Sequence, residues 1–148
     1  MQSSCLLSMR YLTLGSLRMD FDCEGEVDAY SRDLNLEDAT ASVRFRCGGV
    51  EYTRRVFTSF ADNVMVIELA AGEGSKNLGV DLRYACPLTS EVKNEGEYLV
   101  MYCNGAEHEG VPAALHAVVM MRVKSDGKVV CKDGSLSVKD ASSATILL

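Results

Sequence analysis

The sequence has 148 residues, of which 47% are hydrophobic, and its formal net charge is −6. This length and composition suit one folded domain and exclude a wholly disordered chain. The negative charge argues against binding to nucleic acid or to an anionic membrane, since both require basic patches. No apolar run approaches the roughly 20 residues that span a bilayer, and residues 1–10 lack the basic and apolar regions of a signal peptide.

Alternation of apolar and polar residues is the dominant signal in the first half of the chain, and it predicts β-strands. Residues 12–21 alternate with a change of phase at Gly15, which predicts a strand with a β-bulge. Residues 41–47 alternate without a break. The glycine pair at 48–49 then predicts a two-residue turn, because both turn positions need a positive φ, and a return strand over 50–60.

Strands are predicted in the second half of the chain as well. Residues 64–71 are apolar except for Glu68, and this short run predicts a strand that is covered on both faces. Residues 36–41 give the best helix signal, which amounts to one turn. Further strands are predicted at residues 78–84, 115–123, 129–131, 136–138 and 144–148, with turns at 125–128 and 132–134. Short strands at this spacing predict an all-β sandwich or barrel.

Six cysteines are spread along the chain, and none has the spacing of a zinc site. They are Cys5, Cys23, Cys47, Cys86, Cys103 and Cys131. An even number is compatible with disulfides in an oxidising compartment. We favour scattered buried thiols instead, because the domain is large enough to fold without disulfides. In addition, Cys47, Cys86 and Cys103 occupy positions where a strand would place small apolar residues.

An acidic stretch at residues 20–28 imitates the start of a calcium-binding loop. Its oxygen ligands at alternate positions are Asp20, Asp22, Glu24, Glu26 and Asp28, with Gly25 at the sixth position. The twelfth position of such a loop holds a bidentate glutamate, whereas this chain has Ser31, and the flanking residues predict strands instead of helices. A solvated acidic hairpin loop is therefore favoured over a calcium site.

The sequence predicts no catalytic, cofactor-binding or metal-binding residue, and no cofactor. His108 lies in a polar loop and His116 on the strand face opposite Leu115 and Ala117, so each is predicted to be a surface histidine. No nucleophile elbow, phosphate-binding loop or dinucleotide fingerprint occurs. A glycosidase needs two carboxyl groups placed across a sugar-sized cleft, and nothing in the sequence places two acids in that way.

An independent carbohydrate-binding module is an alternative function for an all-β chain. Such modules stack sugar rings on exposed aromatic side chains, tryptophan above all, and this sequence has no tryptophan. Its tyrosines would have to take that role. They are Tyr11, Tyr30, Tyr52, Tyr84, Tyr98 and Tyr102, and most of them fall within strand patterns.

Three stretches, in order, match the motifs of a known domain. They are Tyr11–Phe21 (Y-x-x-L-G-x-L-x-L-x-F), Tyr30–Leu36 (Y-x-R-x-L-D-L) continuing into Gly49–Ser59 (G-V-x-Y-x-R-E-x-F-x-S), and Leu136–Leu148 (L-x-V-x-x-A-x-x-x-T-x-x-L). Asn35 replaces the usual aspartate and Arg55 the usual glutamate. The chain thus resembles the N-terminal domain of the family 95 glycoside hydrolases, the α-L-fucosidases. Arg54 falls in mid-strand, where we expect an aromatic or acidic neighbour to hold it.

The resemblance implies an antiparallel two-sheet β-sandwich of the supersandwich type. In the family, a helical (α/α)6 barrel follows this domain and carries the acid and base of an inverting hydrolysis. The reaction removes terminal L-fucose, typically α-1,2-linked, although some members prefer L-galactose. The resemblance therefore implies that residues 1–148 are one non-catalytic N-terminal domain of a bacterial hydrolase, inactive without the barrel.

The resemblance also implies a truncation and a set of partners. The family's first strands precede the Tyr11 strand and are not present here, and the sequence stops in mid-strand at Leu148, so we expect the chain to be a piece of a longer protein. The expected partners are the catalytic barrel, fucosylated glycans reached through the parent enzyme, and further copies bound through exposed strand edges. No nucleic acid or membrane partner is expected, and the parent is expected to be periplasmic or secreted.

Overall fold

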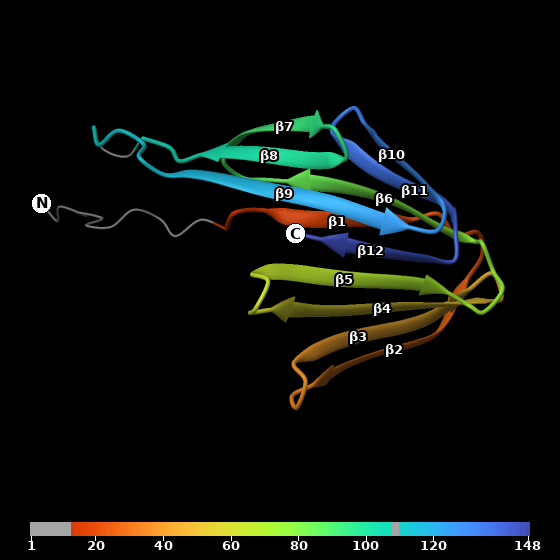
Figure 1. Ribbon diagram of the computed structural model, residues 1–148. Helices are drawn as coiled ribbons and strands as arrows, with labels where there is room; N and C mark the ends of the chain where they lie inside the picture. Colours follow the sequence, from red (N-terminus) through yellow and green to blue (C-terminus); the bar gives the residue numbers. More distant parts are fainter. Residues whose placement is uncertain (1–12, 108–109) are drawn as a thin grey trace, which may run out of the picture.

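A computed structural model describes residues 13–107 and 110–148, and it folds them into twelve strands in two antiparallel sheets with no helix (Figure 1). The strands are β1 (Ser16–Phe21), β2 (Val27–Asn35), β3 (Thr40–Cys47), β4 (Val50–Ser59), β5 (Val64–Ala71), β6 (Leu78–Ala85), β7 (Thr89–Glu95), β8 (Tyr98–Asn104), β9 (His116–Ser125), β10 (Lys128–Lys132), β11 (Ser135–Ala141) and β12 (Ser143–Leu147). The small sheet has the order β1-β6-β11-β10, and the large sheet has the order β2-β3-β4-β5-β12-β9-β8-β7.

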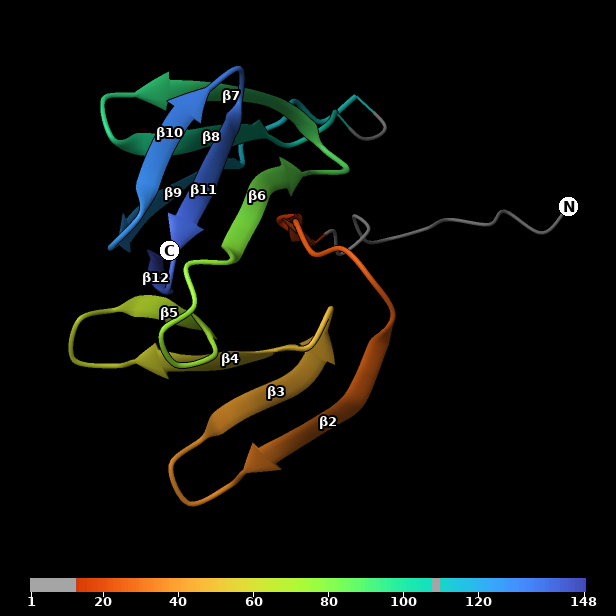
Figure 2. The same cartoon turned by 90° about the vertical axis from the view of Figure 1, so that its right-hand side faces the viewer.

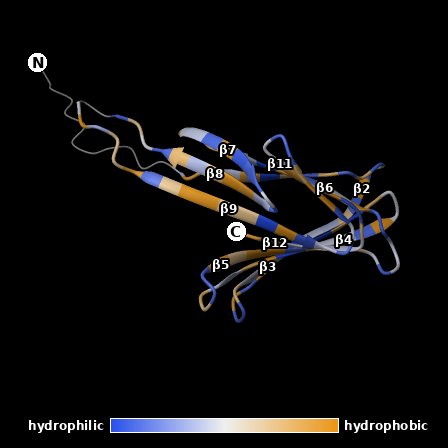
Figure 3. Ribbon diagram, turned by 45° about the horizontal axis from the view of Figure 1, so that its top comes forward, coloured by the Kyte–Doolittle hydropathy of each residue, from blue (hydrophilic) through white to orange (hydrophobic). Residues whose placement is uncertain are grey.

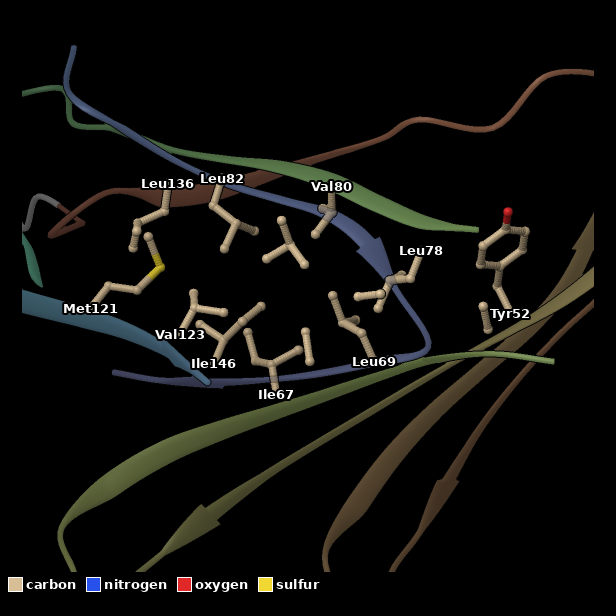
Figure 4. Packing of buried hydrophobic residues seen from close by; sticks show 14 of the residues in the cluster. Tyr52, Ile67, Leu69, Leu78, Val80, Leu82, Met121, Val123, Leu136 and Ile146 are labelled. Atoms are coloured by element: carbon tan, nitrogen blue, oxygen red, sulfur yellow. The ribbon is translucent and has the colours of Figure 1, made fainter. Parts of the chain in front are cut away.

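The small sheet packs against one face of the large sheet and encloses the hydrophobic core (Figure 2). Figure 4 shows side chains of both sheets meeting in this core. The small sheet contributes Leu78, Val80, Leu82, Leu136 and Val138, and the large sheet contributes Ile67, Leu69, Met121, Val123 and Ile146. These residues alternate with polar or exposed ones along most of their strands, as the sequence pattern requires. The predicted all-β, antiparallel two-sheet sandwich is confirmed.

The last strand, β12, occupies the middle of the large sheet. It pairs with β5 on one side, where Ile146 lies opposite Ile67, and with β9 on the other, where Ile146 lies opposite Val123. The other strands of this sheet therefore form two groups, β2 to β5 and β7 to β9, which are joined only by β12.

Glycines have two structural roles here, forming a tight turn and permitting a close approach of two backbones. Gly48 and Gly49 have φ values of +56° and +80° and form the predicted turn between β3 and β4. Gly15, in contrast, does not form a bulge within a strand, because β1 begins only after it. A Cβ placed on Gly15 would lie 2.7 Å from the carbonyl oxygen of Ala85, so this glycine permits a close approach of two backbones. The one-turn helix predicted at 36–41 is also wrong, since residues 36–39 form a turn.

Strand β5 has the predicted bounds but is not covered on both faces. Its inner side chains Ile67 and Leu69 are buried in the core, whereas the outward side chain of Glu68 keeps 42% of its surface exposed. Arg55 in β4 forms an ion pair with Glu68, with 3.0 Å between Nη1 and Oε2, so the arginine with an acidic partner is Arg55. Arg54, for which a partner was predicted, is half-buried in β4 opposite Leu69.

A hydrogen-bonded carboxylate fixes the turn between β9 and β10. Asp126 accepts hydrogen bonds from the backbone amides of Ser142 and Ser143 at 3.0 and 2.9 Å, and from the Ser142 hydroxyl at 2.6 Å. These bonds, chiefly that from the Ser142 side chain, lower the pKa of Asp126 from its ordinary value of 3.8 to about 2. The carboxylate thereby ties this turn to the corner between β11 and β12.

The lowered pKa predicts an acid-dependent contribution to stability. Because the carboxylate is favoured in the folded state, its contribution is complete above about pH 4 and disappears as the pH falls toward about 2. We expect Asp126→Asn to have a lower urea midpoint than the wild type at neutral pH, and the gap to close in acid. Ser142→Ala removes one donor and should open a smaller gap. If the difference in urea midpoint between the wild type and Asp126→Asn were the same at every pH, this assignment would be contradicted.

Candidate functional site: the outer face of the large sheet

One face of the large sheet, here called the outer face, is not covered by any strand of the described residues (Figure 3). Residues directly opposite each other in neighbouring strands share a face, so the register identifies its members. One row crosses five strands, and two shorter rows lie beside it. We call the apolar members of these rows the outer patch: Phe57, Val66, Tyr98, Val100, Tyr102, Val118, Met120 and Leu147.

Strand β9 contributes the most exposed part of the outer patch. Val118 and Met120 keep 55% and 50% of their surface exposed, whereas Val66 and Val100 are buried. Figure 3 shows β9 coloured hydrophobic along its middle and hydrophilic toward its end, where Arg122 and Lys124 follow. The inner side of β9 is also apolar, because it lines the core. Apolar residues on the exposed side of a core strand are typical of a surface that another protein covers.

Cations lie over the aromatic rings at one side of the outer patch. The guanidinium carbon of Arg122 lies 5.7 Å from the centre of the Tyr98 ring, and Arg122 also forms an ion pair with Glu97 at 2.7 Å. The ammonium group of Lys93 lies 5.4 Å from the centre of the Tyr102 ring. Tyrosine and arginine side chains in contact of this kind are common anchors of protein interfaces.

Hydrogen bonds at the same edge shift two pKa values. The Tyr102 hydroxyl donates to Glu95 at 2.8 Å, and this bond raises the pKa of Tyr102. The hydrogen bond from Lys93 to Glu91 raises the pKa of Lys93. Both shifts stabilise the protonated forms, so the tyrosine remains a hydrogen-bond donor and the lysine remains a cation at neutral pH. Neither group is prepared for proton transfer.

A cavity of about 410 Å³ lies near the β3–β4 turn, away from the outer patch. Asp22 and Glu24, from the predicted acidic loop, line it together with Cys23, Cys47 and Tyr52. A hydrogen bond with Cys47, followed by burial, raises the pKa of Cys23 to about 11. The other carboxylates of that loop, Asp20, Glu26 and Asp28, do not line this cavity. The described residues contain no group of three histidine, cysteine, aspartate or glutamate side chains placed to hold a metal ion.

His116 is the histidine within the described residues. His116 is exposed at the start of β9, where its Nδ1 atom lies 2.8 Å from Oδ1 of Asn104. His108 falls outside the described residues. Residues 13–107 and 110–148 contain no helix that is long and apolar enough to cross a membrane.

A known family covers the whole chain. The family model described as "Glycosyl hydrolase family 65, N-terminal domain" matches residues 1–148. The chain belongs to this family. The resemblance to an N-terminal β-sandwich domain of fucosidase-like glycoside hydrolases is thereby confirmed, whereas the assignment to family 95 in particular stays a prediction.

Curated relatives of this N-terminal domain include two proteins named as fucosidases. "Alpha-L-fucosidase 2" of Arabidopsis thaliana is 26% identical over 163 residues, a match that covers 93% of this chain and 19% of the relative. "Probable alpha-fucosidase A" of Aspergillus niger is 24% identical over 141 residues, covering 93% of this chain and 18% of the relative. The chain thus spans about a fifth of the length of these relatives.

The outer patch was not predicted from the sequence of this N-terminal domain, although a signal for it exists. Residues 117–121 and 98–103 are apolar without a break, which means that both faces of β9 and β8 are apolar. The alternation within 115–123 predicts a strand, and that prediction does not use the second apolar set of the strand, Val118 and Met120.

Proposed function

We propose that this chain is the non-catalytic N-terminal domain of an α-L-fucosidase-like glycoside hydrolase, and that its outer patch packs against the helical catalytic barrel of the same enzyme. The observation that carries the proposal is the match of the whole chain to an N-terminal domain family, together with the names of the two relatives. The parent enzyme would release terminal L-fucose, typically α-1,2-linked, and would be a bacterial, exported protein of family 95.

The outer patch supports a packing role. Its exposed centre is Val118 and Met120, and charged side chains such as Arg55 and Arg122 surround it. A packed apolar centre with a polar rim is the usual anatomy of a protein interface. Arg55 and Arg122 already have ion-pair partners, Glu68 at 3.0 Å and Glu97 at 2.7 Å, so covering these two side chains leaves neither charge unpaired.

The test combines binding and activity. We expect the chain alone to leave 2′-fucosyllactose intact and to bind the helical remainder of its parent enzyme in a titration. Val118→Lys should weaken that binding by at least about tenfold, because a lysine would be buried among apolar side chains. Val130→Lys, the same substitution at an outward position of β10, should not change it.

Two results would overturn the proposal. One is hydrolysis of 2′-fucosyllactose by the chain alone that disappears when one of its carboxylates is replaced. The other is equal binding of Val118→Lys and Val130→Lys to the helical remainder, with both variants folded by circular dichroism.

An independent carbohydrate-binding module has less support. Tyr98 and Tyr102 lie on an accessible face, but Arg122 and Lys93 lie over their rings, where a sugar would have to stack. Tyr52 is buried, and among the tyrosines of residues 13–107 and 110–148 Tyr30 is the exposed one, at 59%. This alternative predicts a saturable change in tyrosine fluorescence with fucosylated sugars, and the packing role predicts none.

A further inference from the structure

Two cysteines that are distant in the sequence lie next to each other in the structure. The Sγ atoms of Cys86 and Cys103 lie 3.5 Å apart, although the residues are 17 positions apart in the chain. Cys103 lies in β8, opposite Ala117 and Ser90, and keeps 2% of its surface exposed. Cys86 is half-buried and directly follows the last residue of β6 in the small sheet. Both cysteines are free thiols in this structure, and their sulfur atoms are neighbours.

The backbone at Cys86 lies in the connection between the two sheets and has a close neighbour in the chain at Gly15. The chain crosses here from β6 in the small sheet to β7 in the large sheet. A Cβ on Gly15 would lie 3.3 Å from the Cα of Cys86, so the segment before β1 packs directly on this backbone. Formation of a disulfide would require the two sulfur atoms to approach from 3.5 Å to about 2.0 Å.

We propose that Cys86 and Cys103 form a disulfide that joins the two sheets when the protein meets a disulfide oxidant. The thiolate of Cys86, the more accessible residue, attacks one sulfur of a small-molecule disulfide such as oxidised glutathione, and the first glutathione leaves. The thiolate of Cys103 then attacks the Cys86 sulfur and displaces the second glutathione. The two cysteines lose two protons and two electrons in total, and the oxidant gains both as two thiols.

The surroundings of Cys103 set the rate of the second step. Burial raises the pKa of Cys103, and this cause persists when Cys86 is held in a mixed disulfide. Only the thiolate attacks, so ring closure should speed up as the pH rises, by about tenfold per unit below the pKa of Cys103. A mixed disulfide of Cys86 with glutathione should therefore build up near neutral pH and convert to the internal disulfide as the pH is raised.

The test uses the full chain incubated with oxidised glutathione at about pH 8 and then alkylated. Cleavage after lysine and arginine places Cys86 in the peptide 84–93 and Cys103 in the peptide 94–122, each with a single cysteine. We expect these two peptides to be recovered joined. The oxidised protein should melt on the order of 5–10 °C above the reduced protein.

Variants separate the proposed bond from other effects of oxidation. Cys86→Ser should abolish both the joined peptides and the difference in melting temperature. Cys131→Ser is the matched control, because the Cys131 sulfur contacts Asn94, and it should preserve both. Recovery of Cys86 only as a glutathione adduct at every pH, of both cysteines as free thiols, or of either joined to another cysteine would overturn the proposal. None of these outcomes depends on the proposed packing against a catalytic barrel.

Discussion

Replacing Leu82 by alanine is expected to lower the free energy of unfolding by about 3 kcal/mol. Leu82 is completely buried in β6, and its cross-strand neighbours are Met19 in β1 and Leu136 in β11. It therefore lies in the middle of the small sheet and points into the core between the sheets (Figure 4). Truncation loses the transfer free energy of the side chain and leaves a cavity that the antiparallel strands on both sides cannot close.

Urea unfolding, followed by circular dichroism, would measure this loss. Val130→Ala, at a 38% exposed position of β10, is the matched control and should change the free energy of unfolding by less than about 1 kcal/mol. If the two variants were equally stable, the small sheet would not be packed on the large sheet as described.

Gly127→Ala is expected to cost about 2 kcal/mol of unfolding free energy. Gly127 lies in the turn between β9 and β10, and a Cβ there would collide with the carbonyl oxygen of Lys139 and lie 2.7 Å from the Cβ of Ala141. Neither neighbour can move aside, since one is backbone and the other has no rotatable side chain. The turn and the β10–β11 hairpin would have to separate.

Gly72→Ala is the matched control for this substitution. The nearest atom to a Cβ on Gly72 is a backbone oxygen 3.6 Å away, which is ordinary contact, so the stability should change by less than about 1 kcal/mol. Thermal melts of both variants would show the contrast. Equal melting temperatures would mean that the backbone at Gly127 has room for a side chain.

The sequence predicts the strands that bury one face and expose the other to solvent. Strands β3, β6 and β9 bury one side, so their alternation is visible, and the glycine pair at 48–49 fixes the β3–β4 hairpin. It does not reveal β7 and β8, and it gives β2 only as a strand of unspecified length that flanks the acidic stretch. All nine residues of β2 are exposed, and β7 is an edge strand with a mostly polar surface. Strand β8 has buried residues on both faces, so no alternation remains.

The candidate site was harder to predict than the fold, because it depends on which residues share a face across strands distant in sequence. Phe57 and Val66 join Tyr98 and Leu147 in one row only through the register of five strands. The contact between Cys86 and Cys103 likewise depends on where the chain crosses between sheets. Alternation assigns a residue to the inside or the outside of a strand, but it does not give the order of the strands.

The position of β12 has a consequence for the synthesis of this domain on the ribosome. The strand that joins β5 to β9 consists of residues 143–147, which are made after all the other strands. Until they emerge, β2 to β5 and β7 to β9 are separate groups, each with an open strand edge facing the other. The edge of β5 is therefore open from the synthesis of residue 71 and that of β9 from residue 125, until residues 143–147 pair with both strands and close the large sheet.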